Sequence, residues 1–388
     1  MPPVKRSFLP AITAFAALAL VGCSTGGGSG NAEDRAMDEE GMPSTMVWST
    51  YGTGTSTYAD VAVATEAISR NEEDTAVRVV TSDTAIGRLA PLSRGQAHFS
   101  RTGDEYIFAF EAEHEFVDPG WGPQDLRVAW SPVAPHGLAV PENSTIETME
   151  DLEGSNFPTI TANPSVNNKL EAFLAYGDLT TDDTNQIQLG YGEQPDAVDN
   201  GQLDVLFQQV YGPSLYELEA TTPIRWLQLD EDETEKVARL SAVAPSTFIG
   251  EFSGAPGQDE GEVGTTLYYP IPVVTYADMN DAAVYETITA LVEYYDEYKD
   301  STATAEEWGI DNIALEPIQV PFHDGMIRFL EEQDLWTPEA QVRQEQLVER
   351  GAALRDAWDE IVEDTEPDDL REVWEARKAD IPLPDHLQ

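Results

Sequence analysis

The sequence predicts an α/β fold made of two lobes. Short apolar runs of β-type composition alternate with segments of helical spacing, and turns rich in Gly, Ser, Thr and Pro separate them. That repeated order is typical of open α/β sheets, and the strands are numerous enough for about two such sheets. A chain of 388 residues, 41% of them hydrophobic, is long enough to give each lobe a core.

The first elements are the β-type run Met46–Tyr51, a turn rich in Gly and Thr, and a helix over Asp60–Arg70 whose apolar stripe is Val61, Ala64 and Ile68. Further strands are expected at Ala76–Thr81, Ala97–Thr102, Leu126–Trp130, His136–Val140, Phe157–Thr161, Gln186–Leu189, Leu203–Gln208 and Ile224–Leu229. Helices between them are expected through Ile86 and Leu89 and at Thr148–Gly154, Lys169–Tyr176 and Pro195–Asn200.

The chain after Val284 is predicted to be mainly helical. Helical patterns cover Ala283–Tyr298, Gly325–Gln333 and a charged stretch within Pro338–Ala379. Two polar segments before them, Asp230–Leu240 and Gly254–Gly264, are expected as loops or short helices. The sequence contains no internal repeat.

The charge balance excludes one class of partner. Lys and Arg number 21 against 72 Asp and Glu, which gives a formal net charge of −51. A nucleic acid is therefore not expected as a partner, because its phosphates need clusters of basic side chains. The acidic excess resembles proteins of organisms that live in concentrated salt, where screening weakens the repulsion between carboxylates.

The N-terminus has the pattern of an export signal. Met1–Gly22 combines two basic residues with an apolar stretch, and Leu20-Val-Gly-Cys23 resembles a lipobox, whose Cys becomes the lipid-modified first residue. The alternative is an unlipidated signal with an incidental Cys. Residues 23–43 are rich in Gly, Ser and acid, as in a flexible tether. We expect an extracytoplasmic protein, held on the outer face of the cytoplasmic membrane by lipid at Cys23 alone.

No catalytic or metal-binding pattern emerges from the sequence. The five His residues lack metal-ligand spacing, one Cys cannot form a zinc cluster, and neither a G-x-S-x-G elbow nor a P-loop is present. Among 72 carboxylates, a pair suited to glycoside cleavage carries no information. We therefore expect a binding protein without cofactor or metal. The alternatives are a secreted, surface-anchored hydrolase that uses paired carboxylates and an adhesion or spacer protein.

Several stretches resemble the TAXI family, the extracytoplasmic solute-binding subunits of one class of TRAP (tripartite ATP-independent periplasmic) transporters. They are Tyr51-Gly-Thr-Gly-Thr-Ser-Thr-Tyr58, Val80-Thr-Ser-Asp-Thr84, Leu92-Ser-Arg-Gly-Gln-Ala97, Met149-Glu-Asp-Leu-Glu-Gly154, Asn200-Gly-Gln-Leu-Asp-Val-Leu-Phe207 and Pro321-Phe-His-Asp-Gly-Met-Ile-Arg-Phe-Leu-Glu-Glu-Gln-Asp-Leu-Trp336. Two positions depart from the family pattern: Gly54-Thr-Ser-Thr57 replaces the usual first loop, and His98 stands where Asp is usual.

The resemblance implies a two-lobed fold of the periplasmic-binding-protein type II class, with a hinged cleft. Lobe one would comprise residues 44–135 and 268–336, lobe two residues 136–267, and a C-terminal helical extension residues 337–388. Hinges are expected near Pro132–Pro135 and Tyr268–Val273. The resemblance also implies capture of a small organic acid, glutamate-like or a dicarboxylate, and its delivery to the membrane subunits of a TRAP transporter.

Candidate ligand-binding residues follow predicted strands or begin predicted helices, where side chains and backbone N–H groups converge. They are Thr53, Gly54, Thr55, Thr57, Tyr58, Ser82, Thr84, Asn163, Ser165, Asn167, Gln208, Gln209 and Tyr211. The hydroxyl and Asn side chains have a structural alternative as helix caps, and Tyr58 has one as core packing, whereas the position of Gln208, Gln209 and Tyr211 directly after a buried strand favours a functional role. His323 is expected as a cap.

Arg101 is the preferred charged group for a carboxylate, because it follows a predicted strand and can bind both oxygens. Its alternative role is an ion pair with Asp104 or Glu105. Lys169, in the first turns of a predicted helix, is the second choice. Without either, backbone donors at the helix starts after Gly54 and Asn163 remain.

The acidic composition predicts that salt stabilises the fold. Raising KCl from low to molar concentration should increase the midpoint of chemical denaturation, because screening weakens repulsion spread over the whole surface. Individual surface ion pairs contribute little to this effect. Equal midpoints at both salt concentrations would contradict the prediction.

Overall fold

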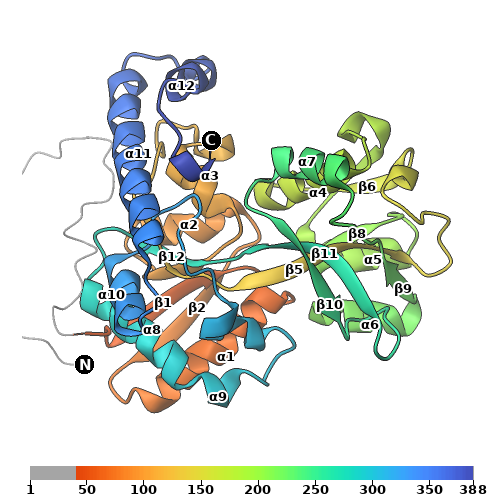
Figure 1. Cartoon of the computed structure of the whole chain (residues 1–388), viewed down its shortest axis with the longest axis horizontal. Coiled ribbons are helices and arrows are strands. Elements are labelled where there is room, and N and C mark those ends of the chain that lie inside the picture. Colours follow the sequence, from red (N-terminus) through yellow and green to blue (C-terminus); the bar gives the residue numbers. More distant parts are fainter. Residues whose placement is uncertain (1–40, 388) are drawn as a thin grey trace, which may run out of the picture.

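The computed structural model describes residues 41–387 and consists of two lobes (Figure 1). Each lobe has its own hydrophobic core. One core draws on residues 46–130 and 273–374, and the other on residues 134–271. Each lobe also has its own five-stranded sheet. The α/β architecture in two lobes is thus confirmed, whereas the export signal and Cys23 lie outside the described residues.

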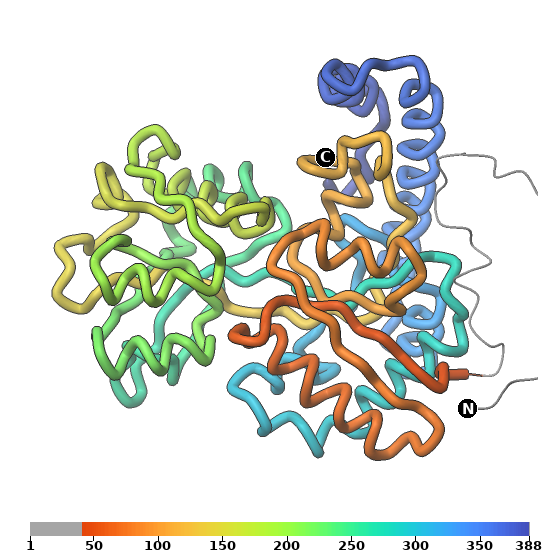
Figure 2. The backbone as a smooth tube through the Cα atoms, turned by 180° about the vertical axis from the view of Figure 1, so that it is seen from behind, coloured from red at the N-terminus to blue at the C-terminus, as the bar shows by residue number. Residues whose placement is uncertain are grey.

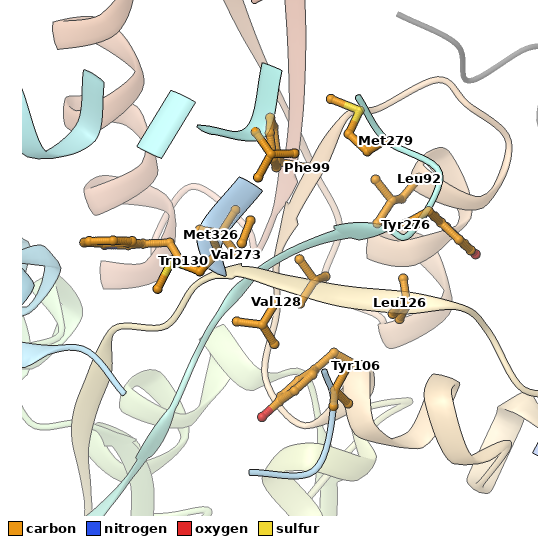
Figure 3. Packing of buried hydrophobic residues seen from close by; sticks show 14 of the residues in the cluster. Leu92, Phe99, Tyr106, Leu126, Val128, Trp130, Val273, Tyr276, Met279 and Met326 are labelled. Carbon is orange, nitrogen blue, oxygen red and sulfur yellow. The ribbon is translucent and has the colours of Figure 1, made fainter. Parts of the chain in front are cut away.

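The sheet of lobe one is mixed, with strand order β2-β1-β3-β12-β4. β1 pairs in parallel with β2 and β3, whereas β12 is antiparallel to both β3 and β4. The strands are β1 (Thr45–Thr50), β2 (Ala76–Thr81), β3 (Phe99–Arg101), β4 (Leu126–Trp130) and β12 (Val273–Tyr276). Their inward side chains, such as Phe99, Val128 and Val273, pack in the core of Figure 3.

Helices surround this sheet, and the backbone trace shows several of them from behind (Figure 2). They are α1 (Ser56–Asn71), α2 (Ala85–Ser93), α3 (Glu105–Glu111), α8 (Asp281–Glu293), α9 (Tyr295–Tyr298), α10 (Asp324–Glu332), α11 (Pro338–Val362) and α12 (Leu370–Lys378). Within residues 41–387, no helix combines the length and hydropathy needed to cross a membrane.

The main sheet of lobe two has the order β10-β11-β5-β8, and β9 also pairs with β5. Its strands are β5 (Val133–Pro141), β8 (Leu206–Gln209), β9 (Ile224–Trp226), β10 (Phe248–Ser253) and β11 (Val263–Pro270); β6 (Asn156–Ile160) and β7 (Asn185–Leu189) form a separate parallel pair. The helices are α4 (Pro164–Tyr176), α5 (Gln194–Asp199), α6 (Pro213–Thr221) and α7 (Thr234–Val243).

The chain crosses between the lobes twice, and the two crossings lie side by side. β4 leads into β5, and β11 leads back into β12. β5 and β11 are antiparallel neighbours, with Val133 opposite Pro270 and Pro135 opposite Tyr268. The crossings therefore form one two-stranded ribbon, which we call the hinge ribbon. Hinge motion about it stays a prediction.

Some elements differ from the sequence-based expectation. β10, β11 and β12 were not predicted, because Gly250 and Glu251 interrupt the apolar pattern of β10 and prolines end β11. The polar segment Asp230–Leu240, by contrast, agrees with its expectation as a loop or short helix, since it contains most of α7. The helix expected at Thr148–Gly154 is a single 3-10 turn, Glu150–Leu152.

The C-terminal helices belong to the core of lobe one. Leu354, Trp358, Leu370 and Trp374 are buried in it. Trp374 Nε1 donates to the Ala112 carbonyl at 2.7 Å. α11 and α12 run along the outer side of lobe one in Figure 1. This segment is expected from sequence as an extension, and it supplies part of the packing that holds the first lobe together.

Trp374→Ala should lower the free energy of unfolding by about 3 to 5 kcal/mol, because it removes a large buried ring and its hydrogen bond. The neighbouring Val373, which is 36% exposed, provides the control Val373→Ala. Chemical denaturation in molar KCl measures both variants. Equal loss of stability in the two would show that α12 does not contribute to the core as described.

Candidate functional site at the lobe interface

The two lobes touch where the carboxyl ends of β1 and β3 face the start of α4 and the end of β8. The Asp104 backbone N–H donates to Ser165 Oγ at 2.9 Å, and Lys169 Nζ forms an ion pair with Asp104 Oδ2. Elsewhere at the interface, the Ser56 hydroxyl donates to Gln209 Oε1. Lobe one and lobe two are therefore joined by polar side chains from both sides.

Three buried ion pairs lie at or beside this interface: Arg88 with Glu105, Arg101 with Asp60, and Lys169 with Asp104. All six side chains are at most 4% exposed. Their formal charges cancel in pairs, as burial demands, since an isolated charge in a protein interior costs several kcal/mol. The interface is strongly polar, yet it carries no surplus of positive charge from these six groups.

Glu105 is the centre of one network. Besides Arg88, it accepts from Thr102 Oγ1 at 2.7 Å and from the Tyr51 hydroxyl at 3.3 Å. The Tyr51 oxygen accepts from the Gly103 N–H at 3.1 Å, and the Arg88 guanidinium lies 3.6 Å from the Tyr51 ring centre. Burial raises the pKa of Tyr51, so its hydroxyl stays protonated and donates.

Arg101 belongs to a second network. Its Nη1 lies 3.0 Å from Asp60 Oδ2, and its guanidinium lies 4.6 Å from the Trp308 ring centre. Asp60 Oδ1 accepts from two threonine hydroxyls at 2.5 and 2.6 Å. Arg101 therefore forms a structural ion pair, as its alternative role predicts, but its partner is Asp60. The two expected partners are engaged elsewhere: Asp104 pairs with Lys169, and Glu105 pairs with Arg88.

Several buried polar atoms of these networks have no hydrogen-bond partner in the described part of the chain. The donors are Arg88 Nε, Arg101 Nε, Arg101 Nη2 and Asn163 Nδ2, and the acceptor is Asp104 Oδ1. Buried polar groups are normally paired, so each such atom requires an explanation. The unpartnered atoms come from both lobes and are mainly donors.

The Gly- and Thr-rich turn before α1 mainly caps the start of that helix. Thr55 Oγ1 accepts from the Tyr58 N–H at 3.2 Å and caps α1, as its structural alternative predicts. Thr53 and Gly54 are exposed, Tyr58 is half-buried, and Thr57 is buried.

Thr84 and His323 both cap helices. Thr84 Oγ1 accepts from the Gly87 N–H at 3.1 Å at the start of α2, and the Thr84 N–H lies 3.3 Å from Ser82 Oγ. His323 is the cap of α10 that the sequence predicts, since its Nδ1 accepts from the Gly325 N–H at 3.1 Å. Ser82 and Thr84 therefore have local structural roles.

The α4 candidates divide between capping and contact with lobe one. Asn163 Oδ1 accepts from the Val166 N–H at 3.2 Å, which leaves its Nδ2 without a partner among the described residues. Asn167 hydrogen-bonds both backbone groups of Ile160, at 2.7 and 2.8 Å, and so holds α4 against β6. Ser165 is the residue that contacts lobe one.

The candidates at the end of β8 and just beyond it face different surroundings: Gln208 and Gln209 are the last residues of the strand, and Tyr211 follows it. Gln208 Nε2 donates to a backbone carbonyl within lobe two at 3.1 Å. Gln209 Nε2 lies 3.2 and 3.3 Å from the two carboxylate oxygens of Glu307, in lobe one, so Gln209 joins the lobes. The Tyr211 hydroxyl donates to the Ser253 carbonyl at 3.0 Å, away from the three ion pairs.

Sequence reasoning missed Tyr51, Arg88, Asp104 and Glu105 as components of one site. Arg88 could have been found most readily from the sequence, because basic residues are few in this chain and Arg88 lies several residues after a predicted strand. Which of the 72 acidic residues pairs with Arg88 could not be predicted from the sequence. Within the described residues, no group of three or more His, Cys, Asp or Glu side chains is placed to hold a metal ion.

Comparison with solved structures finds several proteins of low identity. SsuA, the periplasmic aliphatic sulphonate binding protein from Escherichia coli, is 17% identical; the match covers 89% of this chain and 94% of that one, with a TM-score of 0.44. The alkanesulfonate-binding SsuA from Xanthomonas axonopodis pv. citri, bound to MOPS, is 16% identical over 82% and 93% of the two chains, again with a TM-score of 0.44.

No curated protein matches the sequence. A family model, that of the NMT1-like family, matches residues 49–333. This stretch contains the strands of both sheets from β2 to β12 and every residue of the three buried ion pairs. Because the match spans well over half of the sequence, the chain belongs to the NMT1-like family.

Proposed function

We propose that this protein is the extracytoplasmic solute-binding subunit of a TAXI-type TRAP transporter, which captures a small organic acid between its lobes and delivers it to the membrane subunits. The observation that carries the proposal is the set of buried, unpartnered donors on Arg88, Arg101 and Asn163. They lie where two separately packed lobes meet.

The chemistry of these atoms favours an acid as ligand. A buried donor without a partner costs about 1 to 3 kcal/mol, and the oxygens of a carboxylate would recover that cost. Asp104 Oδ1 is an acceptor, which suits an ammonium or hydroxyl group on the same ligand. Because the three ion pairs cancel in charge, a glutamate-like acid with its own ammonium group fits better than a fully ionised dicarboxylate.

A secreted hydrolase is the competing function, and two carboxylates of the interface, those of Asp60 and Glu105, argue against it. Acid–base cleavage needs carboxyl groups that are free to reach a substrate. Both oxygens of Asp60 are engaged, one by Arg101 and one by two threonine hydroxyls. Both oxygens of Glu105 accept hydrogen bonds as well. These groups therefore act as counter-ions and hydrogen-bond acceptors within the fold.

Asn163→Ser should weaken ligand binding about ten-fold, because serine keeps the capping oxygen of α4 and removes the Nδ2 donor. Asn280 provides a matched control, since it caps α8 in the same manner outside the interface, with Ala283 N–H at 3.1 Å. Calorimetric titration in molar KCl with organic acids, amino acids and sugars measures the wild type, Asn163→Ser and Asn280→Ser.

Arg101→Lys extends the test, because it keeps a positive charge for Asp60 and removes the two unpartnered guanidinium donors. It should weaken acid binding to a similar extent. The proposed ligand class fails if only sugars bind, or if acids bind all variants equally.

Attachment to the membrane is a separate part of the proposal. Cys23→Ala should release the protein from the membrane fraction, because no other segment is expected to hold it there, whereas Ser24→Ala should remain attached. Fractionation of cells that express each variant gives the answer. Full membrane retention of Cys23→Ala would exclude the lipid anchor.

A further inference from the structure

A pocket of about 780 Å³ lies beside the hinge ribbon and has walls from both lobes. Strand alternation places it on one face of the ribbon. Pro135 and Tyr268, which are paired across the ribbon, line the pocket. Tyr269 and His136 lie on the opposite face, where the Tyr269 ring contacts Lys169 Nζ at 4.7 Å. We call this cavity the hinge-face pocket; it is distinct from the interface of the three ion pairs.

Aromatic rings form the lobe-two wall of the hinge-face pocket: Tyr211, Tyr216, Phe248 and Tyr268. Phe248 stacks on Tyr268, with ring centres 5.5 Å apart and an interplanar angle of 20°. The Tyr268 and Tyr211 hydroxyls donate to backbone carbonyls at 2.5 and 3.0 Å, which fixes both rings. Phe248 is nevertheless 53% exposed and Tyr216 49% exposed, so large aromatic surfaces remain open to solvent.

Carboxylates form much of the lobe-one wall, which includes Glu306, Glu307 and Asp311. Of the described residues that line the hinge-face pocket, none is Lys or Arg. Burial and the neighbouring Asp60 raise the pKa of Glu307, so we assign the negative charge of the wall to Glu306 and Asp311. The pocket therefore combines aromatic rings on one side with anionic groups on the other.

We propose that the hinge-face pocket binds a small organic cation with a methylated ammonium group. The faces of aromatic rings attract cations, and ammonium ions with apolar substituents fit such sites because they are weakly hydrated and also bury apolar surface. The carboxylates of Glu306 and Asp311 add attraction of the same sign and repel anions. The organic acid proposed for the lobe interface is therefore excluded from this pocket.

The position of the hinge-face pocket also links its occupant to both lobes. A cation there contacts the aromatic wall of lobe two and the acidic wall of lobe one. Glu307, which lines the pocket, accepts from Gln209, and Gln209 in turn accepts from Ser56. Binding of the cation consequently favours the arrangement of the lobes in which these walls face each other.

Calorimetric titration of the intact protein with tetramethylammonium chloride, without added organic acid and in a KCl background, tests the proposal. We expect saturable binding that weakens about five-fold in Phe248→Ala, from the loss of one cation–π contact, and further in Phe248→Ala combined with Glu306→Gln. Val263→Ala and Glu260→Gln should bind like the wild type, because these exposed residues lie outside the pocket. Unfolding midpoints confirm that every variant is folded.

The neutral analogue 2,2-dimethylpropan-1-ol, which has the branched shape of tetramethylammonium with one added hydroxyl, separates charge recognition from simple apolar binding, and it should bind at least ten-fold more weakly than tetramethylammonium. Equal binding of the two compounds would overturn the proposal. So would the absence of saturation, or an affinity that Phe248→Ala leaves unchanged, since the cation would then be bound elsewhere on the acidic surface. Asn163→Ser should bind tetramethylammonium normally, which keeps failure of the acid-binding proposal distinguishable from failure of this one.

Discussion

The ion pair between Lys169 and Asp104 sets the geometry in which the two lobes meet. Both charges are buried, and they come from different lobes. If the lobes separated, water would hydrate both groups, so the pair adds little net energy to closure while imposing a strict geometry on it. Burial raises the pKa of Asp104 although Lys169 acts to lower it, so the cost of removing this carboxylate from water outweighs the attraction of its partner.

The scarcity of basic residues gives the interface its character. With 21 Lys and Arg against 72 Asp and Glu, most carboxylates must remain on the surface without a basic partner. Arg88, Arg101 and Lys169 nevertheless lie in the interior, each with a dedicated carboxylate. Long-range electrostatics would repel the proposed organic acid, so its recognition would have to come from short-range donors. Arginine suits this role because one guanidinium serves a structural carboxylate and still has N–H groups left for a ligand.

Local patterns were predictable from the sequence, and long-range pairings were not. The alternation of strands and helices and the cap His323 depend on residues close together in the chain, and the structure contains them. The partner of Arg101 is Asp60, 41 residues earlier, and no local rule selects it among so many acids. The strands β10 to β12 were missed for a different reason: Gly250 and Glu251 interrupt the apolar pattern of β10, and prolines separate β11 from β12, although Val273–Tyr276 itself has the composition of a strand. Sequence reasoning therefore predicted a site at the edge of lobe one, where the two lobes meet, but not the charge network that is found there.

The two faces of the hinge ribbon have different neighbours because of strand geometry. Successive side chains of β5 and β11 point to opposite faces, so the same two crossings present Tyr269 to Lys169 and Tyr268 to the acidic hinge-face pocket. Aromatic rings thus stand beside a cation on one face and beside carboxylates on the other. The same type of side chain suits both surroundings, because the face of an aromatic ring attracts cations and its edge tolerates anions. Both faces lie on the only strands that join the lobes in the described part of the chain, so a ligand that shifts the hinge ribbon from one face would also change the other face, and that coupling would be reciprocal.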